Sequence, residues 1–260
     1  MTDALYTPDG ERYVPTGLTR GPWDPQAQHG GPPAALCVRE IERCPSVVPM
    51  QLARLTIELF RPVPLTPLTL RHEIVRDGKR LQVVDVSVEA DGLEVARARG
   101  LRIRATDTTT IGPVATNDVW DEPPPSPESG WVFGARGEKV DGFYRAIEHR
   151  RFDKRTGHRR EAWMRLLVSV VAGEEPSPVQ RLAAVADAGS GISVPLDFRA
   201  VLQINAELTL HVLREPEGPW IGLAARTILG TGGVGQSDTI LFDQSGRVGS
   251  SLQSLLVEAR

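Results

Sequence analysis

The chain has 260 residues, of which 40% are hydrophobic and 24% are charged, as expected of a globular protein. Its formal net charge of −3 provides no overall basic field, which argues against a nucleic-acid-binding protein. The N-terminus lacks the basic and apolar regions of a signal peptide, and no apolar run reaches the ~18 residues of a membrane-spanning helix. The two cysteines, Cys37 and Cys44, are expected to be reduced thiols, so the sequence predicts a cytoplasmic protein.

The first half of the chain predicts one helix followed by about four strands. A strand candidate at 11–21 precedes Gly30-Gly31-Pro32-Pro33, where a helix begins that continues to residue 43. Prolines fit the first turn of a helix because the N–H groups there have no intrahelical partner. Tight turns join the strands that follow, which indicates antiparallel neighbours, and the last strand covers 93–104.

The second half repeats this organisation after a change of composition. Residues 106–130 are rich in Thr, Pro and Ser, so we expect a linker between domains at 1–105 and 131–260. Strand candidates at 143–152 and 160–170 precede a helix that begins near Ser177. The apolar residues of this helix have the spacing of a stripe that lies on a sheet: Val179, Leu182, Ala183 and Ala186.

The two halves also resemble each other in sequence. LTIELFR at 55–61 matches LTLHVLR at 208–214, and in each half a tight turn precedes the last strand. Aligning the turn at Asp91-Gly92 with the one at Ser245-Gly246 places Arg99 opposite Gln253. We therefore expect a duplicated α+β fold, in which two tandem units form a pseudo-two-fold pair.

Two polar residues occupy positions that the pattern predicts to be buried. Asp187 ends the apolar stripe of the second helix, where a carboxylate is costly unless it is hydrogen-bonded or functional. The alternative is a helix-end residue that turns to solvent. Gln253 lies in the last strand, 246–260, which has two partly apolar faces, so its amide needs partners.

Two glycine-rich segments are candidates for substrate binding. Gly30 and Gly31 begin the first helix, where free N–H groups would stabilise an anion or an oxyanion, unless they are ordinary loop glycines. His29 beside them either lines a pocket or packs. Gly232 and Gly233 lie in GTGGVGQS, which precedes a strand rather than a helix. This order argues against a dinucleotide-binding loop and predicts a hairpin, which could still lie near a ligand.

Other chemistries find little support in the sequence. The five histidines form no motif with metal-ligand spacing, and we expect no metal site. No GxSxG elbow is present, which argues against a Ser-His-Asp hydrolase. The basic segment 148–161 is either a solvated hairpin or a docking surface for ligand phosphates.

Taken in order, these segments resemble the TesB-like acyl-CoA thioesterases, or acyl-CoA thioesterase II, of the double-hotdog superfamily. The similarity covers nearly the whole chain, in WDPQAQHGGPPAALCVREIE, LFRPVPLTPLTL, VRDGKRLQVVDVSV, EAWMRL, LAAVAD, INAELTLHVLR and SSLQSLLVEAR. The resemblance implies two hotdog units in one chain, each with a long central helix wrapped by a curled antiparallel sheet. It also implies an acyl-CoA substrate, no cofactor beyond the coenzyme A of that substrate, and further association of the chains into a homo-oligomer.

The resemblance further implies which residues carry the reaction. In that family an aspartate, a threonine or serine, and a glutamine hold the hydrolytic water, and these positions match Asp187, Asn205 and Gln253. Asn205 departs from the usual hydroxyl residue, although an amide can also hydrogen-bond a water. Asp187 would then orient the water and accept its proton. Backbone N–H groups at Gly30-Gly31 or in the AGSG turn after Asp187 would stabilise the oxyanion.

Two other functions remain open at this point. A non-hydrolytic acyl-CoA-binding protein would explain the altered residue at Asn205. A hotdog enoyl-CoA hydratase would need an Asp/His pair, and the sequence brings no histidine near Asp187.

Overall fold

The computed structural model describes residues 3–110, 125–132, 141–152, 159–193 and 200–259. Within them, the first half consists of β1 (Ala4–Asp9), β2 (Arg12–Pro15), α1 (Gly31–Glu42), β3 (Met50–Leu59), β4 (Leu68–Asp77), β5 (Leu81–Ala90) and β6 (Leu93–Arg104). The second half consists of β7 (Trp131–Val132), β8 (Ile147–Arg151), β9 (Arg160–Leu166), β10 (Ser169–Val171), α2 (Pro178–Ala186), α3 (Gly189–Ser193), β11 (Val201–Val212), β12 (Ile221–Leu229), β13 (Val234–Asp243) and β14 (Gly246–Ala259). In the described ranges, three short 3₁₀ helices cover Gly17–Thr19, Pro127–Ser129 and Gly142–Ala146.

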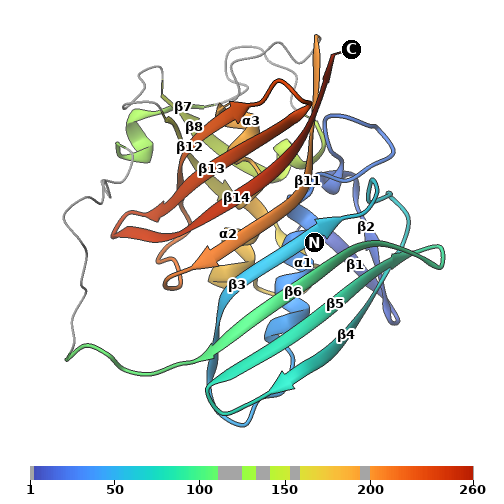
Figure 1. Ribbon diagram of the computed structural model, residues 1–260, viewed down its shortest axis with the longest axis vertical. Coiled ribbons are helices and arrows are strands. Elements are labelled where there is room, and N and C mark those ends of the chain that lie inside the picture. Colours follow the sequence, from blue (N-terminus) through green and yellow to red (C-terminus); the bar gives the residue numbers. More distant parts are fainter. Residues whose placement is uncertain (1–2, 111–124, 133–140, 153–158, 194–199, 260) are drawn as a thin grey trace.

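The strands of the described residues form one sheet in the order β10-β1-β2-β4-β5-β6-β3-β11-β14-β13-β12-β9-β8-β7. The order on one side of the β3–β11 seam mirrors that on the other, which confirms the predicted duplication. Both long helices lie on the same face of this sheet, behind it in Figure 1. The predicted helices and the last strand are confirmed, whereas β1 and its parallel pairing with β10 were not anticipated.

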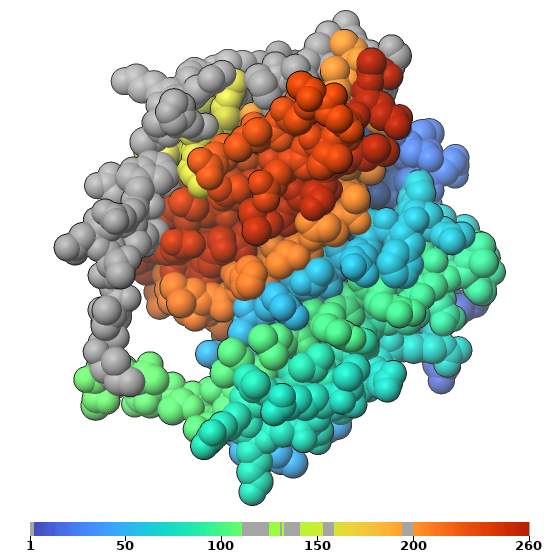
Figure 2. All heavy atoms as spheres, viewed as in Figure 1, coloured from blue at the N-terminus to red at the C-terminus, as the bar shows by residue number. Residues whose placement is uncertain are grey.

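The pseudo-two-fold axis passes through the two repeated segments. β3 and β11 are antiparallel and pair from Arg54↔His211 to Glu58↔Glu207. Thr56 lies directly opposite Thr209, and their hydroxyl oxygens are 3.3 Å apart. Figure 2 shows the two strands, in cyan and orange, side by side along this seam. The segments that match in sequence are therefore also neighbours in space.

The structure corrects the predicted alignment of the two last strands by one residue. Thr56 pairs with Arg99, whereas its counterpart Thr209 pairs with Leu252. Gln253 therefore corresponds to Gly100 and not to Arg99. The turn of the second half lies at residues 244–245, one residue earlier than expected, and this accounts for the shift. Side chains alternate between the two faces of a strand, so residues whose positions differ by one lie on opposite faces. Arg99 therefore lies on the outer face of the sheet, whereas Gln253 lies on the inner face.

The two long helices are antiparallel and in close contact. The start of α1 meets the end of α2 at Gly31, where a Cβ atom would lie 2.2 Å from the carbonyl oxygen of Ala184. At the opposite end, the carboxylate of Glu42 accepts hydrogen bonds from Ser177, the N-cap of α2, and from Gln180. The C-terminal end of α2 is thereby held beside the N-terminal end of α1.

The predicted linker at 106–130 lies largely outside the described residues, since 111–124 are not described. Cys37 and Cys44 are both buried free thiols. No helix of the described residues is long and apolar enough to span a membrane.

Candidate active site

A cavity of about 750 Å³ lies between the two halves of the chain. β3 and β11 stop pairing at Glu58↔Glu207, and beyond this point they diverge toward the upper right of Figure 1. The cavity occupies the space that this divergence leaves. Its apolar lining comes from both halves and includes Trp23, Leu59, Val63, Leu202, Ile204 and Leu256. The polar residues that line it include His29, Asp187, Ser190 and Asn205.

Asp187 lies at the inner wall of this cavity as the C-cap of α2. The carboxylate is 4% exposed, so it points inward and not to solvent. Its Oδ1 accepts hydrogen bonds from Asn205 Nδ2 at 2.6 Å and Gln253 Nε2 at 3.1 Å. The three residues that the resemblance selects thus converge, although they come from a helix end and two different strands.

Asn205 and Gln253 are held in the same orientation by Ser190. The backbone N–H of Ser190 donates to Gln253 Oε1 at 3.0 Å, and its hydroxyl donates to Asn205 Oδ1 at 3.1 Å. Both amide oxygens are therefore occupied, and both NH₂ groups face Asp187. Gln253 is 1% exposed and does not line the cavity, whereas Asn205 does. Gln253 thus supports Asp187 from behind, and Asn205 faces the cavity. The sequence pointed to the AGSG turn that contains Ser190 only for its backbone N–H groups, and not for the Ser190 side chain.

His29 completes the surroundings of the carboxylate from the other half of the chain. Its Nδ1 lies 2.9 Å from Asp187 Oδ2, and its side chain is 10% exposed. The Gly31 N–H also lies 3.2 Å from this nitrogen. A lone pair on Nδ1 would face the carboxylate oxygen across 2.9 Å, so we assign the proton to Nδ1 and treat the contact to Asp187 as the hydrogen bond. Of the two alternatives left open for His29, the structure shows that its side chain lines the cavity.

The carboxylate of Asp187 is held in its ionised form. Burial raises the pKa of Asp187, but the neighbouring His29 and the hydrogen bonds from His29, Asn205 and Gln253 outweigh it and lower the pKa below the usual value. Gly30 allows this arrangement, because a Cβ atom there would lie 2.8 Å from Asp187 Oδ2. The absence of a side chain at Gly30 lets the start of α1 approach the carboxylate.

The glycines named from the sequence have different surroundings. Gly30 lines the cavity, and Gly31 is buried against α2. Because Pro32 and Pro33 have no N–H, Gly30 and Gly31 carry the backbone donors of the first turn of α1. Gly232 and Gly233 lie in the hairpin turn between β12 and β13, outside the residues that line the cavity.

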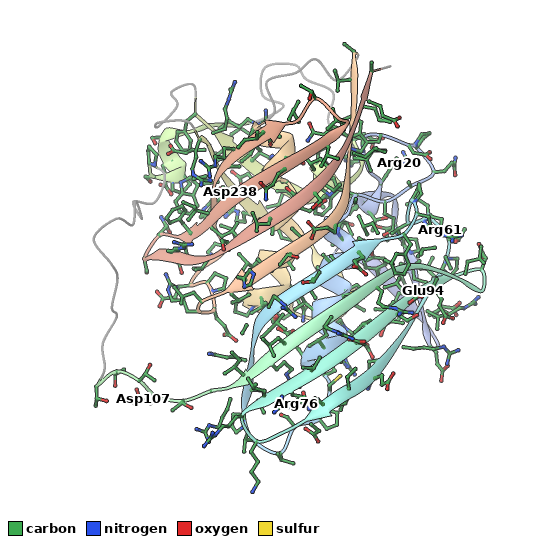
Figure 3. The ribbon with its side chains drawn as sticks, in the orientation of Figure 1. Arg20, Arg61, Arg76, Glu94, Asp107 and Asp238 are labelled. Carbon is green, nitrogen blue, oxygen red and sulfur yellow. The ribbon has the colours of Figure 1, made fainter. Side chains whose placement is uncertain are left out.

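The basic segment contributes one described side chain to the cavity. Arg151 lines it, whereas Arg150 pairs with Glu148 and Arg159 pairs with Asp238. Residues 153–158 lie outside the described residues. A second arginine of the cavity, Arg61, follows β3 in the first half (Figure 3).

The place related to this cavity by the pseudo-two-fold axis is closed. It contains a space of only about 10 Å³, lined in part by Leu52, Arg214 and Glu215. Leu52 precedes Leu55 by as many residues as Asn205 precedes Leu208, so an apolar side chain replaces the amide there. Arg214, the counterpart of Arg61, is hydrogen-bonded to buried Asp243. Of the two equivalent places, the one at Asp187 is open.

Among the described residues, no group of three or more His, Cys, Asp or Glu side chains could hold a metal ion.

Solved structures of similar fold come from several bacteria. A conserved protein with a hot dog fold from Alicyclobacillus acidocaldarius is 18% identical with a TM-score of 0.76, over 98% of this chain and 96% of that one. A putative thioesterase II from Thermobifida fusca is 15% identical with a TM-score of 0.73, over 96% and 93%. An acyl-CoA thioesterase II from Mycobacterium marinum is 15% identical with a TM-score of 0.63, over 100% and 95%. At these identities the similarities show the fold, a double hotdog.

The family itself is shown by sequence models. No curated protein sequence is recognisably similar to the chain. Residues 19–103 match the model of the acyl-CoA thioesterase N-terminal domain, and residues 118–257 match that of the acyl-CoA thioesterase C-terminal domain. Both halves of the duplication are therefore accounted for in their expected order, and the chain belongs to the acyl-CoA thioesterases, a family of thioester hydrolases.

Proposed function

We propose that the cavity hydrolyses acyl-CoA by direct attack of water on the thioester carbonyl. The water binds beside Asp187 and Asn205, and its proton passes to the pair formed by Asp187 and His29. Gln253 contributes by holding the carboxylate and the water site in one geometry. The observation that carries the proposal is the buried carboxylate of Asp187, which lies at the cavity wall and accepts N–H donors on both of its oxygens.

The remaining parts of the reaction use groups around this centre. The N–H group of Gly30, which lines the cavity at the positive end of α1, is assigned to the oxyanion of the tetrahedral intermediate, whereas the Gly31 N–H is directed toward His29 Nδ1. The acyl chain occupies the apolar lining that both halves contribute. The proposal needs no metal and no redox cofactor. Substrate binding by Gly232 and Gly233, the domain limits 1–105 and 131–260 and the homo-oligomer stay predictions.

Asn205 replaces the hydroxyl that the family usually carries without leaving the position empty. Its Nδ2 donates to Asp187, and its Oδ1 accepts the Ser190 hydroxyl. A hydroxyl group, that of Ser190 in α3, therefore still lies near the carboxylate of Asp187. Asn205 connects the two groups, because it is hydrogen-bonded to both. Because Ser190 and Asn205 both line the cavity, either can reach a bound water. This arrangement supports an active site rather than a degraded one.

The proposal is tested by release of free CoA thiol from a panel of acyl-CoA substrates. We expect turnover by the purified protein and loss of turnover in Asp187→Ala with unchanged circular dichroism. Asp85→Ala is the matched control, because Asp85 pairs with Arg99 on the outer face of the sheet. Full activity of Asp187→Ala would contradict the proposal. Tight binding without turnover across the panel would instead identify a non-hydrolytic acyl-CoA-binding protein.

One observation favours a second candidate, enoyl-CoA hydration. The sequence brought no histidine near Asp187, but the fold places His29 Nδ1 2.9 Å from its carboxylate. Such a pair could take a proton from water as the oxygen adds to the β-carbon, and return it to the α-carbon. An assay with an enoyl-CoA separates the two reactions, because hydration removes the conjugated absorbance without releasing a thiol.

A further inference from the structure

We infer that His29, through its Nε2, is the group that takes the proton from the attacking water, while Asp187 holds and stabilises the imidazole. This inference rests on the proposed hydrolysis and assigns the proton transfer within it. The water oxygen bonds to the thioester carbon as its proton moves to Nε2. The C–S bond then breaks, its electron pair leaves with sulfur, and the imidazolium returns the proton to give the CoA thiol and the carboxylic acid.

The first argument is the occupancy of the Asp187 carboxylate. Oδ1 accepts two amide N–H groups and Oδ2 accepts the Nδ1–H of His29. Both acceptor positions of Oδ1 are therefore occupied, and a proton on Oδ2 would remove the negative charge that strengthens the hydrogen bond from Nδ1–H. The low pKa of Asp187 agrees with this, because a weakly basic carboxylate is a poor acceptor near neutral pH. The carboxylate is therefore built to stay ionised.

The second argument is the orientation of the imidazole. Because Nδ1 is bound to Asp187, Nε2 lies on the opposite edge of the ring, and His29 lines the cavity. The ring is also confined by two aromatic neighbours: its centroid lies 4.9 Å from that of Phe143 and 6.0 Å from that of Tyr144. A carboxylate that accepts Nδ1–H fixes the tautomer in which Nε2 is a free base and stabilises the imidazolium that forms.

The third argument is that the other titratable groups around His29 are unsuited to the task. Burial lowers the pKa of His149 to about 3, with smaller contributions from Arg151 and His29. Burial raises the pKa of Tyr144. Arg151 keeps its proton at any working pH. An imidazole has its ordinary pKa closest to neutrality, so among the groups that face this part of the cavity His29 fits a general base.

The test uses a substitution that separates the two ring nitrogens. His29→Asn keeps an N–H near the position of Nδ1, and so keeps the hydrogen bond to Asp187, but it has nothing in place of Nε2. We expect kcat to fall at least about 100-fold. Binding of a non-hydrolysable thioether analogue of acyl-CoA should stay within about twofold, since the wall of the cavity is preserved. Added imidazole should restore part of the activity of His29→Ala.

The pH profile of the wild-type protein provides a readout that does not depend on the folding of a variant. We expect kcat/KM to rise with pH through one ionisation, and this ionisation to be absent from the profile of His29→Asn. A profile that is flat from about pH 5 to pH 8, or a His29→Asn variant with wild-type kcat, would overturn the inference and leave the proposed hydrolysis standing. Absence of thiol release by the wild-type protein would instead overturn the proposed hydrolysis itself.

Discussion

At the scale of single residues, the site depends on how closely the backbone approaches one carboxylate. Asp187 is buried, and its negative charge is tolerated because N–H donors reach both oxygens. One of these donors belongs to His29, and the next residue, Gly30, lies so close to the carboxylate that an added Cβ atom would be 2.8 Å from Oδ2. The missing side chain of Gly30 is therefore as much a part of the site as the polar groups.

Gly30→Ala should impair the reaction while it spares the fold. The added methyl group would lie 2.8–3.1 Å from the carboxylate atoms of Asp187, which three hydrogen bonds hold in place. We expect kcat for thiol release to fall at least ~10-fold, because misplacement of a reacting group by 1 Å can cost about 100-fold. The melting temperature should change little, since the φ of Gly30, −68°, suits alanine. Gly17→Ala is the control, because nothing lies within 4 Å of its added Cβ. Equal kcat values in the two variants would show that this contact does not govern the reaction.

At the scale of elements, the antiparallel packing of α1 on α2 brings residues of different halves together. The start of α1 carries His29 and Gly30, and the end of α2 carries Asp187. The helices are in close contact at Gly31, where an added Cβ atom would lie 2.2 Å from the carbonyl oxygen of Ala184. The Ala184 oxygen belongs to the backbone and cannot rotate away as a side-chain atom can. This contact therefore sets the distance between the two helix ends.

Gly31→Ala should therefore act on stability. The added Cβ would lie 2.2 Å from the Ala184 oxygen, and such overpacking costs about 1–3 kcal/mol. Alanine regains at most ~1 kcal/mol from its better helix propensity, so the clash dominates. We expect the free energy of unfolding in urea to fall by about 1–2 kcal/mol. If Gly31→Ala and Gly30→Ala have the same free energy of unfolding, the two helices can move apart without loss of stability, which would contradict this prediction.

The elements were predictable from the sequence to different degrees. The starts of the helices were predictable, because Pro32 and Pro178 are typical of first helical turns. The buried face of α2 was also predictable, because it carries the apolar stripe from Val179 to Ala186. The register of the last strands was not predictable from the sequence. It depends on whether the turn lies at 244–245 or at 245–246, and the backbone geometry that decides this is not encoded in the composition. That single residue decided whether Gln253 corresponds to Arg99 on the outer face or to Gly100 on the inner one.

At the scale of the whole molecule, the duplication creates two equivalent positions at the ends of the β3–β11 seam. Only the position beside Asp187 contains a large cavity among the described residues. In the first half, Gly100 packs against Ile41 near the end of α1. In the second half, the corresponding Gln253 bonds Asp187 at the end of α2. Family resemblance could select Asp187, Asn205 and Gln253 because all three lie in one half. The pairing of His29 with Asp187 crosses the halves, so only the packing of α1 on α2 reveals it.

A ligand bound in the cavity should therefore protect both halves at once. In hydrogen–deuterium exchange, a saturating thioether analogue of acyl-CoA should slow exchange in segments 59–63 and 202–206, which line the cavity from opposite sides of the seam. The reason is that bound ligand lowers the population of openings that expose these amides. The pseudo-equivalent segments, around Leu52 and at 212–215, provide an internal control, because the space there is too small for a ligand. Protection confined to one half, or equal protection at both ends of the seam, would show that the ligand binds elsewhere than between β3 and β11.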